Sequence, residues 1–175
     1  MKILKKILFV LIIVALYSCQ SSKDKAIKRI KKTEKIVYSN TTGDIDKNAM
    51  NELIKMYSDY VDDYPDDSLS PDFLFKAADY LMYANKPAQS LKFFDKIMKD
   101  YPDYSKAPQC LFLKGYIYEN FYKDLNKAKE IYISFINKYP DNDFADDAQA
   151  SLNNLGKSPE DLIKEFEAKA KKQKK

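Results

Sequence analysis

Apolar residues recur at helical spacing along the chain, and three Tyr-Pro-Asp sequences divide the pattern into units. Their prolines, Pro65, Pro102 and Pro140, lie 37 and 38 residues apart. Large or small apolar residues stand 12, 8 and 5 positions before each proline, and such steps of four and three fall on one face of a helix. A period of this length is typical of two-helix repeats. The residues are Leu53, Tyr57 and Tyr60 in one unit, Ser90, Phe94 and Ile97 in the next, and Ala128, Tyr132 and Phe135 in the last.

A second recurring position lies 13 residues after each proline, at Ala78, Gly115 and Asn153. We interpret it as a small position that lets the first helix of a pair lie close to the second. Each proline ends the preceding helix because it has no amide hydrogen, and we expect the aspartate that follows it to help start the next turn.

These signals predict helices throughout the chain and no sheet, because no stretch alternates with period two. Asp46 and Asp143 are predicted N-caps, and Gly156 is predicted to close a helix. The last helix is predicted to start with Ser158 as its N-cap, Pro159 at its first position and Asp161 three residues after the cap. The expected helices cover about residues 24–38, 46–63, 70–84, 87–100, 105–121, 125–138 and 143–155, followed by one from 158.

The spacing resembles that of tetratricopeptide repeats (TPR). Each such repeat has a small residue in its first helix, Ala and an aromatic residue in its second helix, and a Pro that closes the second helix. One extra residue between Gly115 and Ala128 lengthens that turn. The resemblance covers about residues 24–168 and implies an all-α, TPR-like α-solenoid of three to four antiparallel helix pairs. The residues that define the repeat are Pro65, Ala78, Ser90, Phe94, Pro102, Gly115, Ala128, Tyr132 and Pro140; Tyr118 also fits, whereas Ser90, Ile97 and Phe135 depart from the usual pattern.

Two further sequences are similar to those of particular TPR proteins. The repeat variant in which Tyr-Pro-Asp is followed by Ala-Asp-Asp-Ala, at 145–148, resembles the repeats of periplasmic TPR lipoproteins. These include the TPR lipoproteins of the outer-membrane β-barrel assembly machine and of the Tol–Pal system. The ending NLGKSPEDLIKEFEAK at 154–169, with the Lys-, Asn-, Ile- and Tyr-rich composition, resembles small TPR lipoproteins of Bacteroidetes-type bacteria.

The resemblance also implies a concave surface lined by the first helix of each pair. Aromatic residues with a polar rim are what a protein-binding surface requires, so we expect this groove to hold a peptide or a helix of a partner. The alternative is that several of the aromatic residues belong to the core between repeats. The predicted groove residues are Phe75, Lys76, Asp79, Met82, Tyr83, Phe112, Tyr116, Glu119 and Asn120, with Leu113 beside them.

The N-terminus has the pattern of an export signal with a lipid attachment site. A short basic stretch precedes the ten-residue apolar run 7–16, which is too short for a membrane-spanning helix. Leu16-Tyr17-Ser18-Cys19 resembles the bacterial lipobox, although Tyr17 is larger than usual. We expect a signal peptide at 1–18 and acylation of Cys19, with 19–23 as the tether, because several acyl chains hold a soluble body stably on a membrane. Gln20 favours the outer membrane over the inner by analogy.

The formal charge of +4 conceals an acidic body between basic ends. Residues 36–163 hold 14 Lys against 22 acidic side chains, whereas 23–35 hold seven basic and two acidic ones. The C-terminal end is also basic, and 169–175 form a lysine-rich tail. Basic ends with a single arginine, Arg29, are more typical of solvated tails than of a surface that binds the phosphates of nucleic acid or lipid. We expect no nucleic-acid partner.

The composition argues against catalysis. The chain has no His and three Gly, which excludes histidine-based catalytic sets, imidazole metal sites and a glycine-rich phosphate loop. Two aspartate clusters, around Pro65 and Phe144, lack the glycine and distal glutamate of a calcium loop, and their place at helix starts explains them. We interpret Cys110, in an apolar helical stretch, as a small buried residue.

These observations predict a non-enzymatic interaction scaffold, without cofactor or metal, that binds a protein or peptide and is lipid-anchored at the outer membrane facing the periplasm. Two alternatives remain. One is a structural or assembly subunit of an outer-membrane or cell-wall machine, and the other is a lipoprotein that captures a small or polymeric ligand directly.

Overall fold

The computed structural model describes residues 22–37, 46–158, 160–165 and 167. The expected signal peptide, Cys19 and the lysine-rich tail lie outside these residues. Within the described part every regular element is helical and no strand occurs. Contacts divide the chain into two compact units, of which the first ends at Leu81 and the second begins at Met82, inside one helix.

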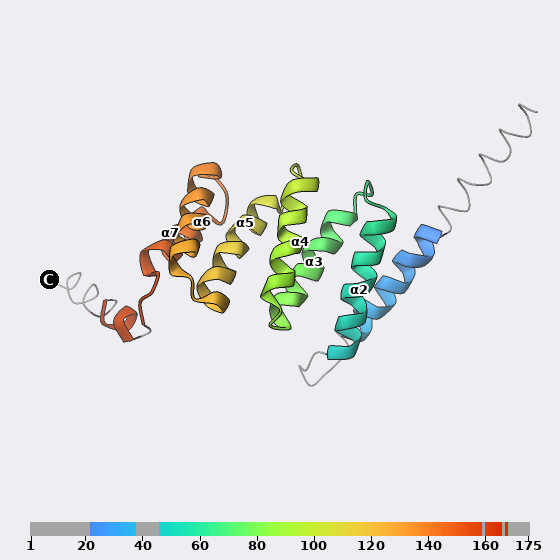
Figure 1. The fold of residues 1–175 in the computed structure, drawn as a ribbon, viewed down its shortest axis with the longest axis horizontal. Coiled ribbons are helices and arrows are strands. Elements are labelled where there is room, and N and C mark those ends of the chain that lie inside the picture. The colour runs from blue at the N-terminus through green and yellow to red at the C-terminus, as the bar shows by residue number, and fades with distance from the viewer. Residues whose placement is uncertain (1–21, 38–45, 159, 166, 168–175) are drawn as a thin grey trace, which may run out of the picture. The chain divides into compact units, whose positions relative to one another are not determined.

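The first unit holds the helix of residues 22–37, then α2 (Lys47–Asp63) and most of α3 (Ser70–Tyr83) (Figure 1). Asp46 caps α2 as predicted, because its Oδ1 accepts hydrogen bonds from the backbone N–H of Asn48 and Ala49 at 2.9 and 3.0 Å. The core of this unit is aromatic: the Tyr57 ring stacks on Phe73 at 5.0 Å, and Tyr60 meets the same ring edge-on at 4.8 Å.

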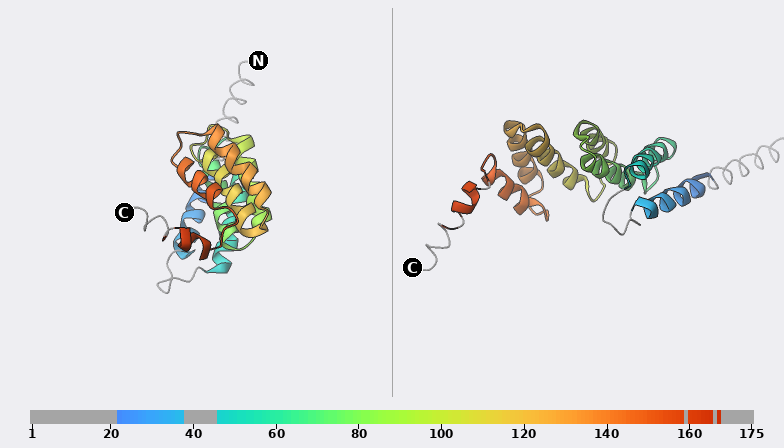
Figure 2. Two further views of the ribbon diagram at one scale, coloured as in Figure 1. Left: turned by 90° about the vertical axis from the view of Figure 1, so that its left-hand side faces the viewer. Right: turned by 90° about the horizontal axis from the view of Figure 1, so that it is seen from below.

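The second unit contains α4 (Pro87–Asp100), α5 (Ala107–Ile117), the π-helical turn η1 (Tyr118–Tyr122), α6 (Leu125–Lys138) and α7 (Ala145–Asn154), and residues 160–165 are again helical. Each helix from α4 to α7 packs against the next, and η1 packs against both α5 and α6. Figure 2 shows the second unit from two further directions, with α5 beside α6.

The repeat predicted from the prolines is built with the same geometry each time. Tyr64, Tyr101 and Tyr139 end their helices at φ/ψ of −133°/59°, −132°/58° and −134°/56°. Each of these tyrosines donates its backbone N–H to the carbonyl four residues earlier. The nine residues at 12, 8 and 5 positions before the prolines are all buried, none more than 2% exposed. The period therefore marks the buried face of every second helix.

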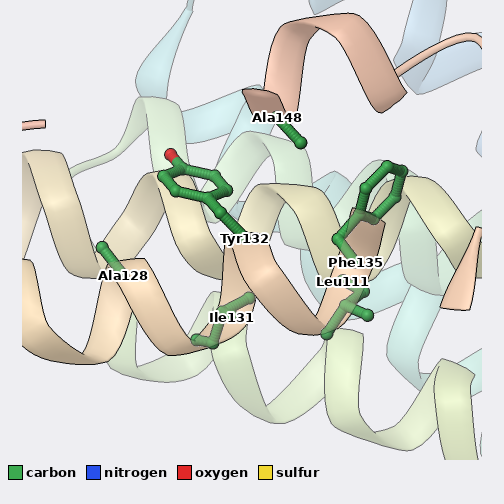
Figure 3. Packing of buried hydrophobic residues seen from close by; sticks show 6 residues of the cluster. All are labelled: Leu111, Ala128, Ile131, Tyr132, Phe135 and Ala148. Atoms are coloured by element: carbon green, nitrogen blue, oxygen red, sulfur yellow. The ribbon is translucent and has the colours of Figure 1, made fainter. Parts of the chain in front are cut away.

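The last of these faces forms the core of the second unit. Its buried residues come from α5, α6 and α7, and Figure 3 shows the Tyr132 and Phe135 rings on one side of α6, facing Ala148 of α7. Burial of such aromatic rings contributes most of the packing free energy in a small helical unit. The cluster consists of Leu111, Ala128, Ile131, Tyr132, Phe135 and Ala148.

Three local predictions are wrong. The predicted helix 105–121 is α5 followed by a π-turn, because the extra residue of this repeat is absorbed there. Asp143 is not the cap of α7: Phe144 holds the N-cap position, and the Asn142 side chain accepts its N–H at 3.1 Å. Asn153 is no small packing position, since it is exposed on α7.

The aspartate directly after each proline lies in the turn that follows the helix, as predicted. In all three repeats the residue after this aspartate donates its backbone N–H to the carbonyl of the tyrosine before the proline, at 3.1, 3.0 and 3.2 Å. In two of the turns that residue also contributes its side chain, since Asp67 Oδ1 accepts the N–H of Leu69 at 2.8 Å and Asn142 Oδ1 accepts that of Phe144. Gly156 ends its segment at φ +77°, and Ser158 Oγ accepts the N–H of Asp161 at 3.1 Å; both were predicted. Together with the helical pairs, these turns confirm the predicted all-α, TPR-like fold class.

Candidate functional site: the exposed side of the first helices

The π-turn η1 is where the second helix pair departs from the first. Both pairs turn through one non-glycine residue with φ +56°, Asn85 in the first and Lys123 in the second. Asn85 follows the small position Ala78 by seven residues, whereas Lys123 follows the small position Gly115 by eight. The next buried small residue, Ser90 or Ala128, comes five residues after the turn residue in both pairs. The extra residue therefore sits in η1, and π-turns of this kind are frequent at functional sites.

The π-turn places a group of aromatic side chains at the end of α5, which we call the η1 surface: Tyr116, Tyr118, Phe121 and Tyr122. The Tyr116 ring meets Phe121 edge-on at 6.3 Å, and Tyr118 lies 5.5 Å from Tyr122 in a tilted arrangement. Tyr116 and Tyr122 are 41% and 45% exposed. Phe121 and Tyr122 were not predicted as site residues; the extra residue before Ala128 was the signal that could have indicated them.

Two polar residues of the predicted groove stabilise this surface. The Asn120 Nδ2 donates to the backbone carbonyl of Tyr116 at 3.0 Å. Glu119 Oε2 accepts a hydrogen bond from the buried Tyr132 hydroxyl at 2.7 Å. Burial, and next this bond to a carboxylate, raise the pKa of Tyr132. Glu119 therefore joins η1 to α6.

Phe112 lies deeper than the other predicted groove residues of this unit. It is half-buried and packs on the cluster of Figure 3, with its ring 5.8 Å from Tyr132 and 5.3 Å from Phe144. This contact matches the alternative that some aromatic residues belong to the core between helices. Leu113 is half-buried too. Tyr83, in contrast, is 61% exposed at the end of α3, and Met82 beside it is half-buried.

In the first unit the predicted groove residues Phe75, Lys76 and Asp79 lie along α3. Lys76 Nζ donates to Glu34 Oε1 at 2.7 Å and stands 5.8 Å from the centroids of the Tyr57 and Phe73 rings. Phe75 is half-buried. Asp79 is exposed as a residue, yet crowding of its carboxyl by protein atoms raises its pKa. Lys76 thus has an ion-pair partner within the first unit.

The described ranges show no metal site. No three Cys, Asp or Glu residues there come together in a way that could hold a metal ion. Cys110 is fully buried, and this burial raises the pKa of its thiol to about 12. No helix among the described residues is long and apolar enough to cross a membrane.

Comparison with known families gives the same repeat. Residues 72–104 and 109–142 each match the family model described as tetratricopeptide repeat, and the matches coincide with α3–α4 and with α5, η1 and α6. No curated protein matches the chain. Tetratricopeptide repeats are typically non-catalytic modules that mediate binding between proteins, so the function class indicated for this chain is a protein-interaction scaffold. The chain thus carries two tetratricopeptide repeats, at residues 72–104 and 109–142.

Proposed function

We propose that this protein is a lipid-anchored scaffold of the bacterial cell envelope, most specifically of the outer membrane facing the periplasm, that binds a protein partner through exposed aromatic residues of its TPR helices. The observation that carries the binding role is the exposure of Tyr83 and Tyr116, by 61% and 41%, on the first helices of the two matched repeats. Tyrosine is among the residues that contribute most to binding at protein interfaces.

The chemistry of the η1 surface supports the same role. Four aromatic rings with Asn120 and Glu119 at their side provide apolar contact area together with hydrogen-bonding groups. A surface of this composition fits an extended peptide or a helix with its own aromatic or aliphatic side chains. The acidic body of the chain favours a partner segment that carries basic residues.

The binding role is tested by photo-cross-linking in cells that express the full chain. A cross-linking amino acid is placed at Tyr83 or Tyr116, and at Ile133 as the control, because Ile133 is 40% exposed on α6, outside the predicted groove. We expect a discrete protein adduct from the first two positions and none from Ile133. The same adducts from all three positions, or none from any, would contradict the proposal.

The anchor rests on the Leu16–Cys19 sequence and needs its own test. Growth with a labelled fatty acid should label the chain, and the Cys19→Ser variant should lose the label and accumulate with residues 1–18 uncleaved. An unlabelled chain would remove the anchor while leaving the protein-binding role open.

A further inference from the structure

The helix of residues 22–37 is held in the first unit by one face. Ile30, Thr33 and Val37 are 1%, 8% and 2% exposed, and they recur at the three- and four-residue spacing of one helical stripe. Residues 22–37, which the composition suggested as a solvated basic end of the chain, therefore form a packed helix. Its orientation on α2 decides which side chains face outward.

Polar contacts fix that orientation at both ends of the helix. Lys23 makes an ion pair with Asp67, which lies just before α3. Near the other end, Glu34 Oε1 accepts a hydrogen bond from the Tyr57 hydroxyl at 2.6 Å as well as from Lys76. With the buried stripe between these two contacts, the helix cannot rotate without losing all three.

Because these contacts fix the orientation of the helix, its outward face is basic. Five lysines and one arginine are exposed along it, and Asp24 is the acidic residue on that side. In the described part of the chain, Lys25, Lys28, Lys32 and Lys35 take part in no ion pair. Ile36, 46% exposed, lies among them. The basic face, as we call it, consists of Lys25, Lys28, Arg29, Lys31, Lys32 and Lys35.

We propose that the basic face docks on an anionic lipid bilayer and binds the phosphates of its headgroups. A helix with cations on its outer face and some apolar surface beside them is typical of segments that lie in a membrane interface. The inference rests in part on the proposed anchor: Cys19 is three residues before Ser22, and three residues span at most about 10 Å. That distance is about one Debye length at physiological salt, so an acylated Cys19 would hold the N-terminal end of the helix within range of the lipid charges.

Two features of the chain favour lipid over nucleic acid as the occupant. Ile36, exposed beside the cations, offers an apolar contact that the acyl-chain boundary of a bilayer accepts and a phosphate backbone does not. Nucleic-acid binding requires basic residues clustered on a folded domain, whereas residues 36–163 carry 22 acidic side chains against 14 lysines.

The test measures lysine reactivity on vesicles. The full chain, purified from the bacterial membrane, is reconstituted into vesicles of phosphatidylcholine alone or of phosphatidylcholine with phosphatidylglycerol, and acetylation of each lysine is followed by mass spectrometry. A lysine held at an anionic surface is stabilised about fivefold. We therefore expect the basic face to react about fivefold more slowly on the anionic vesicles and to recover in high salt, while Lys92 and Lys129, exposed in the second unit, stay unchanged.

Two matched variants make the test specific. Replacing Lys25, Lys28, Lys32 and Lys35 by Gln should abolish the protection of the remaining Lys31. The control replaces Lys92, Lys99, Lys129 and Lys138, four exposed lysines of the second unit, by Gln with the same change in net charge. Here Lys31 should stay protected. Circular dichroism shows whether both variants keep their helices.

Three results would overturn the docking surface: equal reactivity on both kinds of vesicle, equal loss of Lys31 protection in both variants, or protection by duplex DNA equal to that by anionic vesicles. Failure of the anchor is seen separately, as an unacylated Cys19 and a chain that does not stay on phosphatidylcholine vesicles. In that case protection on phosphatidylglycerol vesicles still decides the docking of the basic face.

Discussion

Gly115 of α5 lies directly against the ring of Tyr132 of α6: a Cβ at Gly115 would stand 2.6 Å from Cε1 and 2.8 Å from Cδ1 of that ring. The ring cannot move aside easily, because it is fully buried and its hydroxyl is bonded to Glu119. The small position predicted from the repeat is thus a contact in which the missing side chain of one helix makes room for the aromatic residue of the next.

Gly115→Ala should therefore destabilise the second unit. Overpacking costs about 1–3 kcal/mol, which exceeds the ~1 kcal/mol that alanine gains over glycine inside a helix. Urea unfolding followed by circular dichroism measures the difference. Ala150→Gly, at an exposed position of α7, calibrates the helix propensity without a packing change. If Gly115→Ala instead raised the unfolding free energy by as much as Ala150→Gly lowers it, the contact with Tyr132 would make no contribution to stability.

Tyr132→Phe keeps the ring and removes the hydrogen bond to Glu119. We expect a loss of about 0.5–1.5 kcal/mol in unfolding free energy, since a half-buried carboxylate then lacks its donor. Tyr122→Phe is the control, because Tyr122 is 45% exposed, and it should change stability by less than about 0.5 kcal/mol. Equal effects of the two substitutions would show that the bond does not hold η1 on α6.

Lys123 is strained by its left-handed backbone at φ 56°, which a long side chain adopts at a cost of about 1–2 kcal/mol. The equivalent turn already has an asparagine, Asn85. Lys123→Asn should raise the thermal midpoint, and Lys123→Gln should not, because glutamine has no such tolerance of this conformation. A stabilisation by both would point to the loss of charge as its cause.

Glu34 makes the first unit sensitive to acid. Burial raises the pKa of its carboxyl, but the hydrogen bonds from Lys76 and Tyr57 outweigh burial and leave the pKa below the ordinary 4.5. Between the folded and the unfolded pKa, the unfolded chain binds more protons. The contribution of Glu34 is therefore complete above about pH 4.5 and is lost as the pH falls through the folded value.

Glu34→Gln should accordingly flatten the fall of stability below pH 4.5 while lowering stability at neutral pH. Glu52→Gln, at an exposed position of α2, is the matched control and should follow the unchanged chain at every pH. Thermal unfolding between pH 3 and pH 7 gives both curves. Parallel curves for the two variants would remove Glu34 from the acid response.

Cys110 should not react with thiol reagents in the folded state. Its side chain is fully buried and burial raises the thiol pKa to about 12, so the reactive thiolate is scarce at neutral pH. In a Cys19→Ser background, labelling should begin only with unfolding in urea. Ser105→Cys, at an exposed position of the preceding turn, supplies a thiol that reacts at once. Labelling of Cys110 at the same rate without urea would show that α5 opens locally.

The sequence predicted α6 to its ends at 125–138, the Asp46 cap and the burial of all nine repeat positions, because a local period and local capping chemistry decide these features. It misjudged the end of α5 and the cap of α7. One inserted residue can be absorbed at several places, and only the packing of Gly115 on Tyr132 and of η1 on α6 places it before Lys123. Likewise, Asp143 could cap a helix by its chemistry, but in the turn that follows Pro140 it is the Asn142 side chain that accepts the N–H of Phe144.

For function, the sequence by itself determined the repeat class, the acidic body, the basic segment after Cys19 and the absence of histidine chemistry, since each depends on residue identity and order. Only the tertiary structure decided which aromatic residues are exposed and which are core: Tyr83 and Tyr116 face outward, while Phe112 packs on Phe144. It also decided which face of the predicted helix at 24–38 is buried, through Ile30, Thr33 and Val37, and which face carries the exposed lysines. The reason is physical, because exposure depends on which neighbouring helix covers a given face, and a period along the chain does not contain that information.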